Sequence, residues 1–278
     1  MRYRLIAADV DGTLVDDRRE IPPAVREALA EARAAGCRVT LATGRMYASV
    51  LPFAEAVGTD APLILYNGAA LVERGTRRVT FRRCLPLDDA RLALTLLKRF
   101  PLHVNLYAGE GLYIERVTPA ATESMVKDGV TAEAVGDLVV FLREDPVKLL
   151  CIGEPADLEA FRLSFVEERA RRGLPGQPPH LVRSEETYLE VLPPGVNKGV
   201  GLAELARQLA IPLEAVVAFG DNLNDQEMLE VAGLGVAVGN AHPDLKAKAD
   251  MVAGTNNEGG MAAVIREVIL PDAGGRRG

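Results

Sequence analysis

The chain has 278 residues, of which 48% are hydrophobic and 26% are charged, and its formal net charge is −7. This length predicts two ordinary domains, or one domain that carries a large insertion. The acidic balance, the 5% aromatic content and the absence of Trp exclude a protein that binds nucleic acid through phosphates or base stacking.

The first part of the chain alternates short apolar runs with amphipathic segments. Strands are predicted at 5–10, 38–42 and 63–66, and helices at 22–35 and 46–57. Continuous apolar runs are typical of buried parallel strands, and Pro22-Pro23 and Gly36 are typical of a helix start and a helix end. Successive β-α-β units predict a parallel sheet with helices on both faces.

The pattern changes near Arg77. An alternating run at 78–85 precedes a helix at 88–100, and strands at 104–108 and 112–115 are joined by a glycine-rich hairpin turn. Further helices are predicted at 118–127 and 155–172, and further strands at 148–152, 180–183 and 188–192. This region therefore predicts a separate α+β domain.

The parallel pattern resumes after Pro193-Pro194, with helices predicted at 198–209, 225–231 and 262–270 and strands at 215–220 and 234–238. We therefore predict a doubly wound, Rossmann-like α/β core with a parallel sheet. The core is formed by residues 1–83 and 192–278, and the α+β domain at 84–191 is inserted into it. Residues 271–278 are predicted to be a disordered tail.

Two carboxylates follow the first strand, in Asp9-Val10-Asp11-Gly12-Thr13. Ligands of open parallel sheets bind beyond the carboxyl ends of the strands. Two carboxylates so close together repel each other unless a cation or a proton lies between them. A simple Asp-Gly turn is the alternative interpretation of this motif when it is taken alone.

A second acidic cluster, Asp221, Asn222, Asn224 and Asp225, follows the strand predicted at 215–220. A helix cap is the alternative role, but one cap does not need four such side chains. Oxygen ligands at two neighbouring strand ends suit Mg²⁺, which prefers carboxylates, carbonyls and retained waters.

Two further motifs favour an anionic substrate. Thr43-Gly44-Arg45 lies between a strand and a helix, where a hydroxyl and backbone N–H groups form an anion pocket. Lys198 begins a helix, where a cation is unfavourable unless it pairs with carboxylates and a phosphate. Together the four motifs indicate phosphoryl transfer through a carboxylate nucleophile.

These motifs, in this order, resemble the four motifs of the haloacid dehalogenase superfamily of phosphohydrolases. The insertion between the second and third motifs looks like the C2B cap of Cof-type members. Tyr66-Asn67-Gly68-Ala69 and the segment at 238–243 support the resemblance, which covers nearly the whole chain.

The resemblance implies a role for each motif residue. Asp9 is the expected nucleophile, which forms an aspartyl-phosphate, and Asp11 is the expected general acid and base. The expected Mg²⁺ site comprises the Asp9 side chain, the Asp11 carbonyl and the Asp221 side chain, with Asp225 orienting metal-bound waters. The residues expected to contact phosphate or substrate are Val10, Thr43, Gly44, Arg45, Asn67, Lys198 and Asn224.

The resemblance therefore implies a Mg²⁺-dependent phosphatase of small metabolites, such as sugar phosphates or phosphorylated cofactor precursors, with residues 84–191 as the substrate-specificity domain. A sugar-phosphate phosphomutase or phosphotransferase that uses the same Asp9 nucleophile stays open. A non-catalytic phosphometabolite-binding regulator is a further alternative. Asp11 argues against a dehalogenase, which does not need an aspartate there.

The expected binding partner is a small phosphorylated metabolite, and we expect no binding to nucleic acid or to a membrane. The protein itself is expected to be a monomer or a homodimer. Cys37, Cys84 and Cys151 are odd in number and far apart, which predicts a reducing cytoplasmic location without disulfides. No run approaches the roughly 18 apolar residues that indicate a membrane span.

Overall fold

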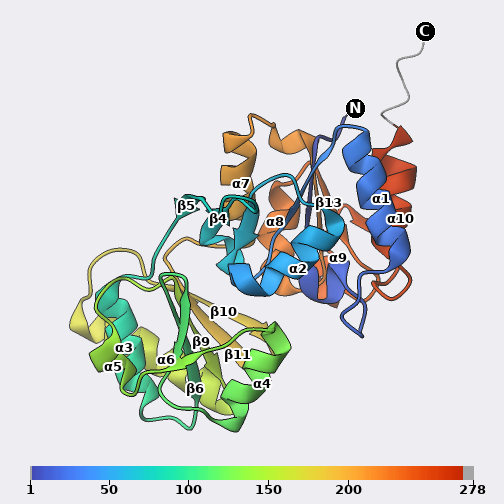
Figure 1. The fold of residues 1–278 in the computed structure, drawn as a ribbon. Helices are drawn as coiled ribbons and strands as arrows, with labels where there is room; N and C mark the ends of the chain where they lie inside the picture. The colour runs from blue at the N-terminus through green and yellow to red at the C-terminus, as the bar shows by residue number, and fades with distance from the viewer. Residues whose placement is uncertain (1, 272–278) are drawn as a thin grey trace. The chain divides into compact units, whose positions relative to one another are not determined.

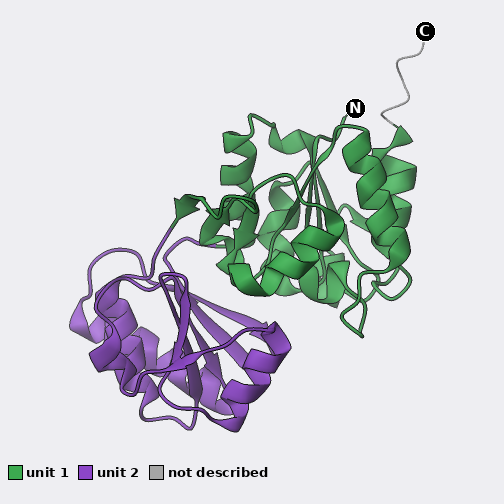
Figure 2. Ribbon diagram, viewed as in Figure 1, with its two compact units in different colours: residues 1–82, 197–278 green, residues 83–196 purple. Residues whose placement is uncertain are grey.

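The computed structural model describes residues 2–271, and the chain folds into two compact units (Figure 2). One unit consists of Met1–Arg82 with Asn197–Gly278, and the other consists of Arg83–Val196. We call them the core unit and the inserted unit. Of the tail predicted at 271–278, all but Pro271 lies outside the described residues.

A five-stranded sheet of order β14-β13-β12-β1-β2 lies at the centre of the core unit, and its neighbouring strands are all parallel (Figure 1). Its strands are β1 (Leu5–Ala8), β2 (Arg38–Leu41), β12 (Val216–Gly220), β13 (Leu234–Ala237) and β14 (Met251–Val252). Every residue of β1 and β12 is buried, which explains why these strands are continuous apolar runs in the sequence.

Helices pack on both faces of this sheet. They are α1 (Pro23–Ala34), α2 (Tyr47–Val57), α7 (Lys198–Gln208), α8 (Gln226–Val231), α9 (Pro243–Lys246) and α10 (Gly260–Val264). Helix α1 packs against α10 and α2, whereas α7 packs against α8, and Figure 1 shows the α1–α10 and α7–α8 pairs on opposite sides of the sheet. The predicted doubly wound α/β fold is confirmed.

The strand predicted at 63–66 has different partners from those we expected. It forms β3 (Leu63–Leu65) in a three-stranded antiparallel sheet with β4 (Ala70–Val72) and β5 (Val79–Arg82). One parallel bridge, Ala42 to Ile64, connects β3 to the chain that follows β2. The chain reverses at Asn67 and Gly68, whose φ angles are +54° and +92°, so the next apolar residues pair back onto β3.

The inserted unit has a six-stranded sheet of order β10-β11-β9-β6-β7-β8, in which only the β7–β8 pair is parallel among the pairings of the described residues. Its strands are β6 (His103–Ala108), β7 (Gly111–Ile114), β8 (Glu133–Ala134), β9 (Lys148–Ile152), β10 (His180–Glu185) and β11 (Tyr188–Leu192). Its helices are α3 (Leu87–Leu97), α4 (Pro119–Asp128), α5 (Leu138–Phe141) and α6 (Pro155–Arg172).

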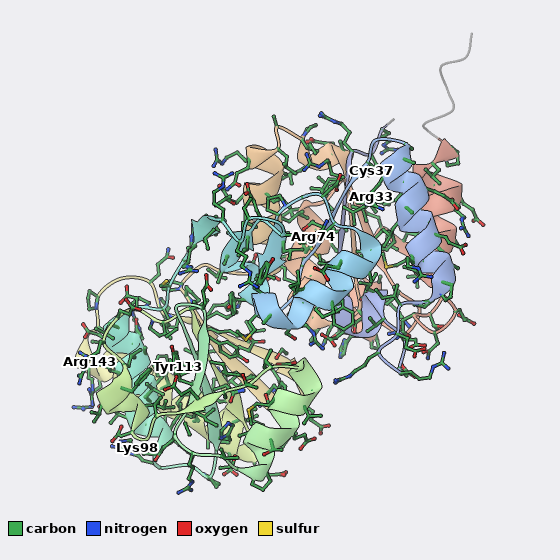
Figure 3. The ribbon with its side chains drawn as sticks, viewed as in Figure 1. Arg33, Cys37, Arg74, Lys98, Tyr113 and Arg143 are labelled. Atoms are coloured by element: carbon green, nitrogen blue, oxygen red, sulfur yellow. The ribbon has the colours of Figure 1, made fainter. Side chains whose placement is uncertain are left out.

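A hydrophobic core of its own stabilises the inserted unit. Phe161 and Phe165 of α6 are fully buried together with Leu149 of β9. At the edge of this cluster the Tyr113 ring packs against Phe141 with their centroids 4.6 Å apart, and Figure 3 labels Tyr113.

In the core unit, β2, β1 and β12 are neighbours and parallel, so their carboxyl ends lie at one edge of the sheet. Residues that follow these ends in the sequence are therefore brought close together.

Candidate active site

Asp9 follows β1 directly, and its position is set by the neighbouring strand. The Asp9 backbone N–H donates to the Phe219 carbonyl of β12 at 3.0 Å, and Asp9 as a whole residue is 6% exposed. The chain then turns at Gly12, which has a φ of +78°. A Cβ atom at position 12 would lie 2.6 Å from Asp221 Oδ2, so only glycine fits the turn against that carboxylate.

Lys198 lies at the start of α7 and is 1% exposed. Its Nζ donates to Asp9 Oδ1 and to Asp225 Oδ1, both at 2.6 Å. The helix therefore places one buried cation between carboxylates from two different strand ends. Two such charge-assisted hydrogen bonds offset the cost of removing the ammonium from water.

Asp225 organises the loop that follows β12. It is completely buried, and its Oδ2 accepts hydrogen bonds from the Asp221 and Asn222 backbone N–H groups at 3.0 and 3.2 Å. Together with Asn222 it forms a capping box at the start of the following helical turn. Asp225 therefore holds both the loop and Lys198.

The electrostatics of this cluster reflect several negative charges in one buried space. Burial raises the pKa of Asp9 well above its usual value; the Lys198 charge opposes this shift, and the nearby carboxylates of Asp225, Asp221 and Asp11 add to it. Burial, with the Asp225 charge, also raises the pKa of Asp221 to about 6. Burial alone would lower the pKa of Lys198, but Asp225 and Asp9 hold it above its usual value.

Asp9, Asp221 and Asp225 each place one carboxylate oxygen within 4.8 Å of the others. Their mutual repulsion is what a divalent cation would relieve, and carboxylate oxygens are suitable ligands for Mg²⁺. The donor set of the described residues therefore fits a Mg²⁺ ion.

The loop after β2 contributes a second group of side chains. Thr43 is buried, and its Oγ1 accepts a hydrogen bond from the Arg45 backbone N–H at 3.1 Å. The Arg45 guanidinium binds both oxygens of Asp11, with Nε to Oδ2 at 2.7 Å and Nη2 to Oδ1 at 2.6 Å. The Asp11 carboxylate is thus oriented by Arg45 and is not part of the Asp9–Asp221–Asp225 cluster.

The structure connects the other predicted site residues as well. Asn224 Nδ2 donates to Asn67 Oδ1 at 3.1 Å, although 157 residues separate the two. Val10 is buried at the start of the turn, and its carbonyl accepts from the Val15 N–H at 3.1 Å. Gly44 lies half-buried beside Thr43.

Two residues in this region are absent from the predicted site. Thr13 Oγ1 donates to Asp221 Oδ1 at 2.8 Å, and Asn240 Nδ2 donates to the Gly12 carbonyl at 2.8 Å. Thr13 is part of the first motif and was within reach of sequence reasoning. Asn240 acts across 228 residues, so only the fold reveals its contact.

None of the helices within residues 2–271 is both long enough and apolar enough to cross a membrane.

Comparison with known proteins identifies the family. A family model described as haloacid dehalogenase-like hydrolase matches residues 6–265. The chain is 31% identical to the 5-amino-6-(5-phospho-D-ribitylamino)uracil phosphatase YcsE of Bacillus subtilis, over 96% of each chain. It is 29% identical to the pyridoxal phosphate phosphatase YbhA of Escherichia coli, over 95% of this chain and 98% of that one.

A solved structure has a similar fold over nearly the whole chain. The crystal structure of TM0651 from Thermotoga maritima matches with a TM-score of 0.82 and 30% identity, over 96% of this chain and 97% of that one. The chain therefore belongs to the haloacid dehalogenase-like hydrolase family, as the motifs indicated, and is one of its phosphoric monoester hydrolases.

Proposed function

We propose that this protein is a Mg²⁺-dependent phosphatase of small phosphorylated metabolites, with Asp9 as the nucleophile. The observation that carries the proposal is the position of Lys198, whose Nζ lies 2.6 Å from both Asp9 and Asp225 in a buried site. A lysine held in this way neutralises charge where a carboxylate approaches an anionic phosphoryl group.

In the proposed first step, the Asp9 carboxylate attacks phosphorus and the bond from phosphorus to the leaving oxygen breaks. Asp11 gives its proton to the leaving oxygen, and an aspartyl-phosphate remains on Asp9. In the second step Asp11 takes a proton from a water molecule, and the water oxygen attacks phosphorus. Inorganic phosphate leaves and the Asp9 carboxylate is regenerated.

The surrounding residues orient these groups. We assign contacts with the phosphoryl oxygens to the Thr43 hydroxyl, the backbone N–H groups of Val10 and Gly44, and the Asn224 amide. Lys198 provides positive charge, and Arg45 positions Asp11 through the two hydrogen bonds described above. Asn67, which accepts from Asn224, orients that amide.

The Asp9 and Asp221 side chains with the Asp11 carbonyl would hold Mg²⁺, and Asp225 would act through the loop and metal-bound waters. When it is bound, the cation neutralises charge on the transferring phosphoryl group.

For the leaving group, we propose a small metabolite selected by the inserted unit, which contains the residues 84–191 expected to form the substrate-specificity domain. Two relatives are named for their substrates, which are pyridoxal phosphate and 5-amino-6-(5-phospho-D-ribitylamino)uracil. Both are phosphorylated precursors or forms of cofactors, so this class is the first to be screened.

A phosphate-release screen with Mg²⁺ over sugar phosphates and phosphorylated cofactor precursors tests the proposal. The wild type should release phosphate from at least one ester, and Asp9→Asn should lower the rate by about a thousandfold or more, as removal of a nucleophile does. The exposed Asp244→Asn on α9 is the matched control and should keep the wild-type rate.

Removal of the metal with EDTA should abolish phosphate release, and added Mg²⁺ should restore it. No release from any ester, or a wild-type rate in Asp9→Asn, would contradict the proposal. Conversion of a hexose phosphate to its isomer without phosphate release would instead assign a phosphomutase.

A further inference from the structure

The loop that carries the first motif contains its own source of backbone freedom. We call residues 9–15 the nucleophile loop, because Asp9 and Asp11, the groups to which the chemistry is assigned, lie in it. Gly12 follows them with a φ of +78°, and glycine has more backbone freedom than any other residue. A loop that must present two carboxylates in fixed positions therefore needs contacts that restrict it.

Asn240 restricts the loop at Gly12. Its Nδ2 donates to the Gly12 carbonyl at 2.8 Å, and its Oδ1 accepts from the Asn256 backbone N–H at 2.9 Å. An amide donates only through its nitrogen and accepts only through its oxygen, so turning the group over would lose both bonds. The Gly12 carbonyl thus has a fixed partner, although Asn240 itself is exposed.

Asn256 restricts the other end of the loop. It is 4% exposed, and its Nδ2 donates to the Val15 carbonyl at 3.0 Å. Because the Asn256 N–H also binds Asn240, the two asparagines form one chain of hydrogen bonds from Gly12 to Val15. The loop is closed between these points, since the Val15 N–H donates to the Val10 carbonyl at 3.1 Å. We call Asn240 and Asn256 the asparagine clamp.

The turn that contains Asn240 also contacts the second acidic loop. The His242 backbone N–H donates to the Asp221 carbonyl at 2.8 Å. Asp221 Oδ1 in turn accepts from Thr13 Oγ1, in the nucleophile loop, at 2.8 Å. The turn after β13 therefore ties together the two loops whose carboxylates form the acidic cluster. It does so through uncharged amide groups, which fix the loops without adding a charge to the cluster.

We propose that Asn240 and Asn256 are positioning residues, which fix the backbone of the nucleophile loop so that Asp9 and Asp11 keep the geometry that phosphoryl transfer needs. This inference rests on the proposed function of the site. Displacements of about 1 Å at an active site already slow a reaction strongly. Most of the assigned phosphate contacts, such as those of Thr43, come from other elements, so the clamp should affect the chemical step more than substrate binding.

Site-resolved hydrogen exchange of the full chain, without added metal or substrate, tests the clamp. Asn240→Ala removes both amide contacts, so the Val15 amide should exchange at least about fivefold faster than in the wild type. Asn240→Asp keeps an oxygen that accepts from the Asn256 N–H, but an ionised carboxylate cannot donate to the Gly12 carbonyl. It should speed exchange at Val15 while the Asn256 amide stays protected.

Steady-state phosphate release with Mg²⁺ tests the consequence for the reaction. Asn240→Ala should lower kcat about tenfold and change KM by less than about twofold, the pattern expected when the chemical step loses its geometry. Asn256→Ala, which removes the bond to the Val15 carbonyl, should lower kcat in the same way.

Asn257→Ala is the matched control. Asn257 is exposed; its Oδ1 accepts from the Asp17 N–H at 3.0 Å, and its Nδ2 donates to Asp17 Oδ2 at 2.9 Å. The variant therefore removes the asparagine next to Asn256, with two hydrogen bonds to the chain just beyond the nucleophile loop. Exchange should rise at the Asp17 amide but not at Val15, and kcat should keep the wild-type value.

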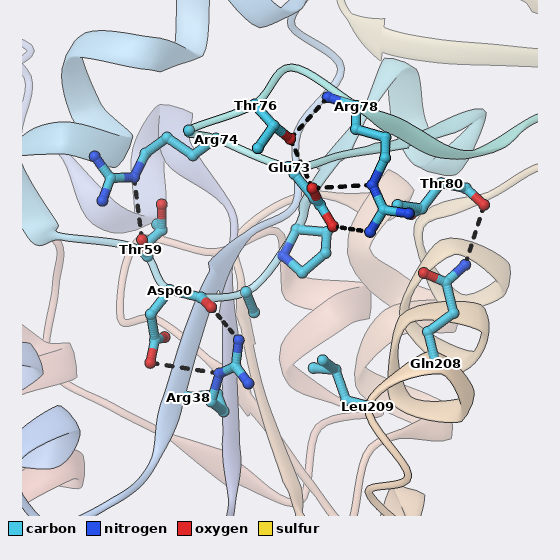
Figure 4. A pocket seen from close by; sticks show the side chains of 13 residues that line it. Arg38, Thr59, Asp60, Glu73, Arg74, Thr76, Arg78, Thr80, Gln208 and Leu209 are labelled. Atoms are coloured by element: carbon cyan, nitrogen blue, oxygen red, sulfur yellow. Dashed lines mark hydrogen bonds and ion pairs between the residues drawn. The ribbon is translucent and has the colours of Figure 1, made fainter.

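A second control lies at the opposite edge of the sheet. Gln208, the last residue of α7, lines a polar cavity together with Arg38, the first residue of β2 (Figure 4). Its Nε2 donates to the Thr80 carbonyl at 3.4 Å. Gln208→Ala thus removes an amide contact between elements of the same unit, at the end of α7 away from Lys198. Both Val15 exchange and kcat should stay at their wild-type values.

The outcomes separate this inference from the proposed function. Wild-type exchange at Val15 in Asn240→Ala, a wild-type kcat in that variant, or an equal loss of kcat in Asn257→Ala would each overturn the inference alone, while an active wild type upholds the function. If the wild type released no phosphate from any ester, the proposed function would fall, and with it the role of the clamp in the reaction.

Discussion

Gly12 illustrates how one residue controls the geometry of the site. Its φ of +78° is a left-handed conformation, and the space where a Cβ would lie is taken by Asp221 Oδ2 at 2.6 Å. Gly36 has a similar φ of +94°, but no atom lies within 4 Å of its Cβ position. A side chain at position 36 would therefore cause backbone strain alone, whereas a side chain at position 12 would cause backbone strain and a clash with Asp221.

We predict that Gly12→Ala lowers phosphatase activity at least about tenfold. The new methyl group would displace the Asp221 carboxylate, and displacements of about 1 Å at an active site already slow a reaction strongly. Gly36→Ala should cost only the backbone strain, about 1–2 kcal/mol of unfolding free energy, with activity retained. Denaturant unfolding and steady-state rates for both variants check this. Equal activity losses in the two variants would contradict the steric explanation.

The cysteines differ in their surroundings. Burial, with the nearby Asp60 charge, raises the pKa of Cys37 to about 12, and burial raises the pKa of Cys151 as well. Cys84 is only partly buried. Because the thiolate is the reactive form, the first two thiols should be unreactive in the folded protein.

We therefore predict that a chromogenic disulfide reagent at pH 8 modifies Cys84 faster than the other two thiols. Cys37 and Cys151 should react only at the rate at which the protein opens, and all three thiols should react at once in denaturant. A Cys84→Ser variant should lose the fast phase. Three equal rates in the native protein would show that burial does not protect Cys37 and Cys151.

At the scale of elements, α7 links a local sequence signal to the site. Asn197 caps the helix, and its Oδ1 accepts from the Val200 N–H at 2.8 Å, immediately before Lys198. In the inserted unit, Thr118 caps α4 in the same way, accepting from the Ala121 N–H at 3.1 Å. Both caps satisfy helix N–H groups, but only one neighbours Lys198.

We predict that Asn197→Ala and Thr118→Ala each lower the unfolding free energy of their own unit by about 1 kcal/mol, the usual contribution of a helix cap. Asn197→Ala should also lower the phosphatase kcat, since the first turn of α7 positions Lys198. Thr118→Ala should leave kcat unchanged. Thermal unfolding and kcat for the two variants provide the check. Wild-type kcat in Asn197→Ala would show that the cap is not needed to position Lys198.

The same elements show which parts of the fold the sequence makes predictable. The predicted strand at 148–152 and the predicted helix at 155–172 have the bounds that the structure gives β9 and α6. The apolar run of β9, and the Pro155 and Gly173 at the two ends of α6, can be recognised from neighbouring residues in the sequence alone. The partner of β3 was not predictable in this way, because pairing with β4 depends on the reversal at Asn67, a residue with a positive φ.

On the scale of the whole molecule, the chain divides into two units, each with its own core. The two ends of the inserted unit are close together, since the Arg83 guanidinium donates to the Gly195 carbonyl at 3.3 Å. A segment with adjacent ends and a separate hydrophobic core has the properties of an independent folding unit.

We predict that residues 83–196 expressed alone fold cooperatively, because the cluster around Phe161 and Phe165 lies wholly within that segment. Circular dichroism with a single thermal transition and dispersed NMR spectra would confirm it. Phe161→Ala in the same fragment should lower the stability by about 3–5 kcal/mol, as expected for a buried aromatic side chain. A fragment without a cooperative transition would show that its core depends on the other unit.

The sequence by itself determined the family, the doubly wound core and the residue types at its strand ends. These follow from short apolar runs and from motifs in which chemistry requires particular side chains at close spacing. Only the tertiary structure decided which of these side chains bind one another. Lys198 and Asp9 are 189 residues apart, and Arg45 and Asp11 are 34 apart, yet each pair forms a hydrogen bond of 2.6 or 2.7 Å. Such contacts depend on how strands and helices pack, and no local pattern in the chain carries that information.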